Sequence, residues 1–202
     1  SYSTATVHKY MNTELGLHSI VRPKKPEYEH GKPHKIFDNK LNQDFTADEI
    51  NRKWCTDFTY LFLSNHEVRY NCTILDLHDR SVVASITDRR ITSNLAIRTL
   101  QKALESQPPI KGGLILHSDQ GVQFTSCEFV NFCKDNNITQ SMSKAGCPYD
   151  NAPMERFYNT FKSNFYNVTS FSNVEVMDEL TTKYINLSLI HISEPTRHSL
   201  IS

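Results

Sequence analysis

The chain has 202 residues, of which 38% are hydrophobic and 22% are charged. This composition supplies a core and excludes a disordered tail, a collagen-like repeat and a disulfide-based scaffold. The 22 basic and 22 acidic residues give a net charge of zero, so a nucleic-acid partner must be argued from local features. With no signal peptide and no run of roughly 18 apolar residues, we expect a cytoplasmic protein without a membrane partner.

The five cysteines are widely spaced, and no two of them form a CxxC pair. This spacing argues against a zinc site or a redox motif. We therefore expect buried, reduced thiols at Cys55, Cys72, Cys127, Cys133 and Cys147.

The first fifty residues predict a helix followed by a basic segment. Apolar residues recur at three- and four-residue spacing over 4–15, and Gly16 is placed to end that helix. Prolines and basic residues follow, so we expect a linker over 21–52. It is either a solvated tether or an arm along a DNA phosphate backbone, and the two are evenly balanced. The candidate DNA contacts are Arg22, Lys24 and Lys25.

Periodicity changes repeatedly after Lys53, where we expect the compact domain to begin. In chain order we expect strands over 54–63, 68–76 and 81–86, a helix over 93–104 capped by Thr92 or Ser93, a strand at 114–116, a helix opened by a capping box at 125–128, a strand over 138–142, and a helix over 154–165 capped by Asn151. This order predicts an α/β fold. Three antiparallel strands come first, and further strands are added through helices that flank a mixed sheet.

Three acidic residues stand out, although each has an ordinary structural explanation. Asp57 interrupts an aromatic strand, where aspartate is unusual, but it could face solvent. Asp119 follows a buried strand, where ligand sites collect in open α/β sheets, but turn aspartates are common. Glu155 lies in the first turn of a helix, where an acid also favours the helix dipole. In the same helix Asn159 and Lys162 share the face of Glu155, and a phenylalanine stripe lies on another side.

Three motifs that contain these acids resemble one family. They are WCTDFTY at 54–60, HSDQGVQFTS at 117–126 and YDNAPMERF at 149–157. Thirty-five residues separate Asp119 from Glu155. The motifs and this spacing resemble those of insertion-sequence DDE transposases with a retroviral-integrase-like catalytic core. The resemblance implies an RNase H-like fold over 53–186, with Asp57, Asp119 and Glu155 converging at one edge of the sheet.

The resemblance also implies a chemistry. Three carboxylates repel one another unless cations compensate them, and all-oxygen ligands favour two Mg²⁺ ions, with Mn²⁺ as a substitute. Such a site cleaves DNA strands and transfers them by in-line displacement. The implied partners are element ends and target DNA in the bacterial nucleoid, and further copies of the chain in a synaptic complex. Lys162 and Asn159 are the implied DNA contacts of the core.

Two alternatives stay open, and several residues have structural readings. The alternatives are an RNase H-like nuclease that only hydrolyses and an inactive remnant that binds DNA or full-length transposase. We expect Asp76 and Asp79 to belong to a turn and Trp54 to the core. Residues 1–20 resemble the last helix of a helix-turn-helix region. Residues 187–202 depart from the family and resemble a translated sequencing adapter, so we suspect a non-native tail there.

Overall fold

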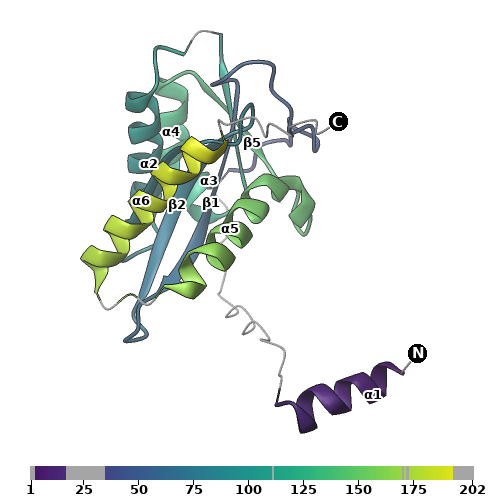
Figure 1. Cartoon of the computed structure of the whole chain (residues 1–202). Helices are drawn as coiled ribbons and strands as arrows, with labels where there is room; N and C mark the ends of the chain where they lie inside the picture. The colour runs from purple at the N-terminus through teal and green to yellow at the C-terminus, as the bar shows by residue number, and fades with distance from the viewer. Residues whose placement is uncertain (1–2, 17–34, 111, 170, 172, 193–202) are drawn as a thin grey trace, which may run out of the picture.

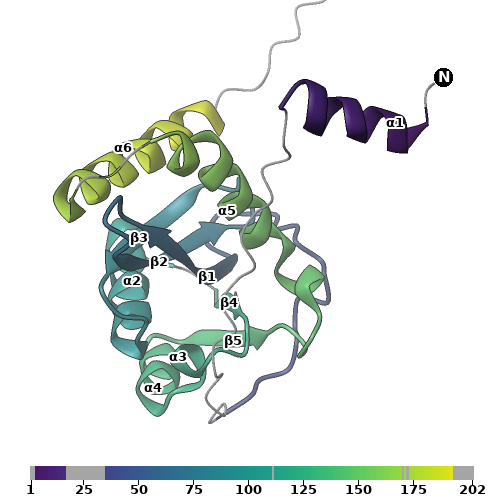
Figure 2. The same cartoon turned by 90° about the horizontal axis from the view of Figure 1, so that it is seen from below.

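The computed structural model describes residues 3–16, 35–110, 112–169, 171 and 173–192. A five-stranded sheet forms the centre, and helices cover both of its faces (Figures 1 and 2). The strands are β1 (Lys53–Phe62), β2 (Val68–Asp76), β3 (Val82–Asp88), β4 (Leu114–Ser118) and β5 (Ile138–Met142). The α-helices are α1 (Thr4–Lys9), α2 (Ser93–Ser106), α3 (Val122–Thr125), α4 (Cys127–Asp135), α5 (Ala152–Asn164) and α6 (Val174–Ile192).

The strand order is β3-β2-β1-β4-β5. Strands β1, β2 and β3 pair antiparallel, whereas β4 and β5 run parallel to β1. Parallel neighbours need a crossover, and α2 precedes β4 while α4 precedes β5. The predicted mixed α/β sheet is confirmed.

Side chains alternate between two cores, one on each face of the sheet. Trp54 is fully buried in the core formed with α2 and α4, and its neighbour Cys55 is fully buried in the core formed with α5 and α6. Figure 2 shows α5 and α6 on one face and α2, α3 and α4 on the other. Alternate residues of a strand point to opposite faces, so β1 is covered on both sides. A polar residue of β1 therefore avoids a free-energy cost of burial only where it lies near an edge of the sheet or has a hydrogen-bond partner.

The packed region starts upstream of Lys53, within the segment expected to be a linker. Leu41 is only 2% exposed and belongs to the core that contains α5 and α6. The backbone N–H of Lys40 donates to Ser141 Oγ at 2.8 Å, which attaches this segment beside β5. Residues 35–52 therefore lie against the body of the domain.

The helix ends agree with the predictions in part. The helix that begins at Thr4 continues as a π-helix over Tyr10–Glu14. Gly16 follows with a φ of +62°, so the predicted helix is confirmed. Thr92 caps α2 by accepting from the N–H of Leu95. At α4 the cap is Ser126, one residue later than the predicted box, because Thr125 still belongs to the short helix α3.

The prediction that all five cysteines are buried is wrong for two of them. Cys127 and Cys147 are exposed, whereas the other three are buried, and all five are free thiols. Cys127 is the first residue of α4 and Cys147 precedes a 3-10 turn over Pro148–Asn151. Both lie at element ends, where the chain meets solvent.

The C-terminal helix α6 packs on the same face as α5. Met177 is fully buried, and the ring of Tyr184 stacks on Phe165 at 4.8 Å between centroids. The helix continues to Ile192, so the first six residues of the suspected tail are helical. Within the described residues, no helix combines the length and apolar character needed to cross a membrane.

Candidate active site

The register between β1 and β4 brings two of the three predicted acids to the same level. The paired residues are Lys53 with Ile115, Trp54 with Leu116, and Cys55 with His117. Continued by two residues, this register puts Asp57 level with Asp119. Asp119 lies directly after β4, and pairing ends before either aspartate, so both lie where the two strands part.

Each aspartate is half-buried, and each accepts a hydrogen bond from its own backbone neighbourhood. Asp57 Oδ1 accepts from the N–H of Phe58 at 2.7 Å. Asp119 Oδ1 accepts from the N–H of Gly121 at 2.9 Å. A Cβ at Gly121 would lie 2.9 Å from that same Oδ1, so glycine lets the turn close against the Asp119 carboxylate.

Helix α5 is attached to β1 through the backbone carbonyl groups on either side of the Asp57 side chain, those of Thr56 and Asp57. The Asn151 side chain donates to the carbonyl oxygen of Thr56 at 3.4 Å. The Tyr158 hydroxyl donates to the carbonyl oxygen of Asp57 at 2.8 Å and lies 3.4 Å from that of Asn71. Burial raises the pKa of Tyr158 well above 10.0, so it stays a donor at neutral pH. Glu155 lies between these two attachment points.

This arrangement changes the predicted role of Asn151. It occupies the N-cap position of α5, but its side chain makes no capping hydrogen bond. It joins the helix to β1 instead, and its Oδ1 is buried without a hydrogen-bond partner. Pro153 lies in the first turn of α5, where a backbone N–H would have no acceptor within the helix, so a residue without an N–H fits there.

The predicted DNA contacts of the core lie on the outer side of α5. Glu155 and Asn159 are exposed and Lys162 is half-buried. The phenylalanine stripe of the same helix faces the core, where Phe161 is 3% exposed and stacks with Phe157. The two faces expected for this helix are thus present. Arg22, Lys24 and Lys25 lie outside the described residues.

Asp150, which the sequence did not single out, holds the turn that leads into α5. It is 4% exposed and accepts from Asn39 Nδ2, Gln43 Nε2 and the N–H of Lys144, each at 2.9 Å. The hydrogen bond from Gln43 and the others lower the pKa of Asp150, which keeps it ionised. The segment upstream of β1 is thereby bound to the turn before Glu155.

His117 is fully buried beneath the same end of the sheet. Its ring nitrogens lie 2.9 Å from Ser141 Oγ and 3.1 Å from Ser143 Oγ. Burial lowers the pKa of His117 below 6.5, and nearby Asp150 partly opposes this effect. A neutral imidazole that bridges β4 to the end of β5 is the structural consequence.

Of the two aspartates expected in a turn, Asp79 lies in the turn after β2, whereas Asp76 is the last residue of β2, so the turn prediction is wrong for Asp76. Asp76 is 2% exposed and accepts from the N–H of Asn51, the indole of Trp54 and the N–H of His78. Asp79 is exposed and accepts from the N–H of Ser81 at 2.9 Å. The predicted core position of Trp54 is confirmed.

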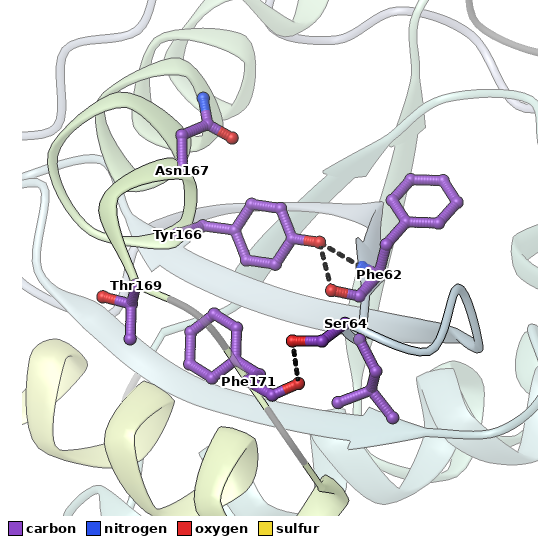
Figure 3. A pocket seen from close by; sticks show the side chains of 7 residues that line it. Phe62, Ser64, Tyr166, Asn167, Thr169 and Phe171 are labelled. Atoms are coloured by element: carbon purple, nitrogen blue, oxygen red, sulfur yellow. Dashed lines mark hydrogen bonds between the residues drawn. The ribbon is translucent and has the colours of Figure 1, made fainter.

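A hollow lies away from these acids. It has a volume of about 340 Å³ and is formed by the end of β1 and the 3-10 turn η3 (Tyr166–Val168), with Phe171 below (Figure 3). Tyr166 closes one wall, because its hydroxyl bonds both the N–H and the carbonyl of Phe62. Phe62 is five residues beyond Asp57 in β1, so this hollow is separate from the acids.

Across the part of the chain that the structure describes, no three His, Cys, Asp or Glu residues lie close enough to hold one metal ion. The acids that share this end of the sheet are therefore placed on neighbouring elements but are not gathered around one point. Their backbone positions come from the sheet register and the α5 attachments, and the side chains of Asp57 and Asp119 accept hydrogen bonds from nearby backbone N–H groups.

Comparison with solved structures identifies the fold. The Mos1 transposase catalytic domain with raltegravir and Mg matches with a TM-score of 0.58 and 13% identity, over 67% of this chain and 71% of that chain. A chain of the simian T-cell lymphotropic virus intasome matches with a TM-score of 0.54 and 21% identity, over 71% of this chain and 47% of that chain. The mixed sheet is thus the RNase H-like fold of integrase and transposase catalytic cores.

Comparison of the sequence with family models identifies the family. The model of the family described as "Integrase core domain" matches residues 47–148, and a second model of the same description matches residues 136–187. The chain belongs to the integrase core domain family, as the three motifs predicted.

Two curated relatives come from Escherichia coli (strain K12). The putative transposase InsK of insertion sequence element IS150 is 32% identical over 179 residues, which is 89% of this chain and 62% of InsK. Transposase InsF of insertion sequence IS3A is 35% identical over 156 residues, which is 77% of this chain and 53% of InsF. The chain therefore spans between about half and three fifths of the length of these relatives.

Proposed function

We propose that this chain is the catalytic core of an insertion-sequence transposase that cleaves DNA strands and joins them. Asp57, Asp119 and Glu155 are its metal-binding catalytic carboxylates. The observation that supports this proposal most directly is the β1–β4 register, which, when it is continued by two residues, puts Asp57 level with Asp119. Membership of the integrase core domain family supports it independently.

The donor set suits divalent magnesium. The three proposed ligands are carboxylates, and hard oxygen donors without thiolate or imidazole favour Mg²⁺, with Mn²⁺ as a substitute. When bound, a pair of such ions supplies activation of the attacking oxygen and charge neutralisation on the leaving oxygen of a phosphodiester. To share an ion, the carboxylates of Asp57 and Asp119 must turn away from the N–H groups of Phe58 and Gly121.

The protein's own contribution is positioning. The paired part of β1 and β4 holds the two aspartates at a common level, and the Asn151 and Tyr158 hydrogen bonds hold the start of α5 against β1. Glu155 is exposed on that helix, so its carboxylate is accessible to a substrate. Backbone positions that are already fixed reduce the reorganisation needed when the phosphodiester arrives.

We assign DNA contacts to Asn159 and Lys162 on α5, and to Arg22, Lys24 and Lys25 upstream. Element ends and target DNA are the substrates, and joining two ends requires further copies of the chain. A Lys162→Ala variant should bind DNA more weakly, and the slope of log binding constant against log salt should fall by about one. Lys183→Ala is the matched control, because Lys183 is a lysine of a different helix, α6, where it pairs with Glu179.

The decisive experiment is nicking and joining of supercoiled plasmid with Mg²⁺ or Mn²⁺. Asp57→Asn, Asp119→Asn and Glu155→Gln should each abolish both products, whereas Asp79→Asn, an exposed turn residue, should keep them. Joined products separate a transposase from a nuclease that only hydrolyses. If the folded chain produces neither product, the proposal is wrong and a DNA-binding remnant is the better description.

A further inference from the structure

Asp150 is a buried carboxylate that the proposed reaction does not use. It is 4% exposed, and its hydrogen-bond donors are two side-chain amides and one backbone N–H. Its Oδ1 accepts from Gln43 Nε2, whereas its Oδ2 accepts from Asn39 Nδ2 and from the N–H of Lys144. A buried carboxylate costs free energy unless hydrogen bonds satisfy it, and here both oxygens have partners. Asp150 therefore joins chain segments and is not a candidate metal ligand.

One of the segments that meet at Asp150 leads to the end of β4. Ser143 donates its N–H to the carbonyl oxygen of Ser118 at 2.9 Å. Ser118 directly precedes Asp119, and Ser143 directly precedes Lys144. The hydrogen bond from Lys144 to Asp150 thus begins one residue away from a contact with the strand end that carries Asp119.

A second segment leads from Asp150 to the other two proposed acids. The next residue, Asn151, donates its side-chain amide to the carbonyl oxygen of Thr56, which directly precedes Asp57. Helix α5 begins one residue later and carries Glu155 in its first turn. Because Asn151 makes no capping hydrogen bond, contacts with other segments fix the start of this helix in place of a local cap.

The two amide partners of Asp150 come from a tight turn upstream of β1. Asn39 Oδ1 accepts from the N–H groups of Leu41 and Asn42, and Asn39 Nδ2 donates to Asp150. Asn42 and Gln43 have φ values of +46° and +64°, a left-handed conformation that persists in non-glycine residues only where other contacts compensate it. Asn39 and Gln43 precede residue 47, where the match to the integrase core model begins.

We infer that Asp150 is a positioning residue of the proposed active site, and that with Asn39 and Gln43 it sets how the chain segments of the three acids lie relative to one another. The inference rests on the proposed function and adds to it residues that bind neither the metal nor DNA. Asp150 touches no reacting atom and acts through Asn151 and through the loop that begins at Lys144. Disturbing its hydrogen bonds should therefore weaken cation binding and slow cleavage in the folded protein.

The variant that tests this inference is Gln43→Glu, which replaces the amide donor to Asp150 Oδ1 by a second carboxylate. Two adjacent carboxylates repel each other. Gln43 is exposed, so the substitution is compatible with folding, and urea unfolding verifies it. The affinity for Mn²⁺, measured from the electron paramagnetic resonance of free Mn²⁺, and the rate of plasmid nicking should both fall, on the order of tenfold.

The same substitution in the Asp150→Asn background should have no such effect. The amide nitrogen at position 150 can donate to the new carboxylate, while the amide oxygen keeps the hydrogen bonds from Asn39 and Lys144. Gln101→Glu is the matched control, because Gln101 donates to Glu105 on the exposed surface of α2 and the substitution also brings two carboxylates together. It should change neither Mn²⁺ affinity nor nicking.

The possible results separate the inference from the proposed function. Equal Mn²⁺ affinity and equal nicking in folded Gln43→Glu and in the unaltered chain would overturn the inference and leave the proposed function intact. So would an equal loss with and without Asp150→Asn, since the effect would then not pass through Asp150. Failure of the unaltered chain both to bind Mn²⁺ and to nick DNA would overturn both proposals.

Discussion

The hydroxyl of Tyr158 donates to the carbonyl oxygen of Asp57 at 2.8 Å, and so connects the helix of one proposed catalytic acid to the strand of another. The bond involves the backbone of Asp57 and leaves its carboxylate to other partners. Tyr158 is three residues beyond Glu155, on the buried side of α5, where it is 7% exposed. The spacing between β1 and α5 therefore depends in part on one buried hydroxyl.

Replacing Tyr158 by phenylalanine should destabilise the domain by about 1 kcal/mol and reduce plasmid nicking more than this loss explains. The buried carbonyl loses a donor, and Glu155 loses an attachment to β1. Urea unfolding and nicking rates measure the two effects. Tyr166→Phe is the control, since it removes a hydroxyl bonded to Phe62 at the other end of β1 and should leave nicking unchanged in the folded protein.

Asp76→Ala should be among the most destabilising single substitutions, at about 3 kcal/mol. It would leave the indole N–H of Trp54 and the backbone N–H of Asn51 without their acceptor in a buried place. Equilibrium urea denaturation gives the value. Asp79→Ala, three residues on and exposed, should change the free energy of unfolding by less than about 1 kcal/mol. Similar losses for both variants would contradict this account of the turn.

His117 should make stability depend on pH. Its folded-state pKa lies below 6.5 because burial disfavours the charged ring, so the unfolded chain binds more protons as the pH falls. Its contribution is therefore complete above pH 6.5 and is lost progressively below it. Urea unfolding between pH 5 and pH 8 should show a smaller slope for His117→Gln than for the unaltered chain.

Thiol reagents should distinguish two classes of cysteine. Cys127 and Cys147 are exposed and should react in the native protein. Burial raises the pKa of Cys72 and of Cys133 to about 12, and raises that of Cys55 further, so these thiols should react only after unfolding. A native titration of two thiols and a denatured titration of five is the expected result. A third thiol that reacts quickly in the native protein would show that one of the two hydrophobic cores opens readily.

Local patterns were sufficient to predict most of the sheet. The bounds of β2 and β5 coincide with the predicted 68–76 and 138–142, because turn residues flank both segments. The placement of residues 35–52 could not be predicted, since it depends on single contacts such as Asn39 with Asp150, 111 residues apart. Such contacts leave no periodicity in the sequence, and prolines with basic residues suggested a tether.

The candidate site was predictable where a residue conflicts with its surroundings. Asp57 in an aromatic strand was such a conflict. Its position relative to Asp119 follows from the register between β1 and β4. Tyr158 gave no comparable signal, because a tyrosine in a phenylalanine-rich helix is typical of a core. Its contribution depends on which group its hydroxyl contacts, and a pattern of apolar residues does not predict that. The role of Asp150 was likewise hidden in a turn, where acidic residues are common.

The short pairing between β1 and β4 has a consequence for the mechanics of the sheet. Backbone hydrogen bonds hold the two strands together only as far as Cys55 and His117. In the proposed site, a cation held by both Asp57 and Asp119 would link the two strands beyond this point. Cation binding would then stabilise the separated ends of β1 and β4. Amide exchange near these ends should slow as the cation concentration rises.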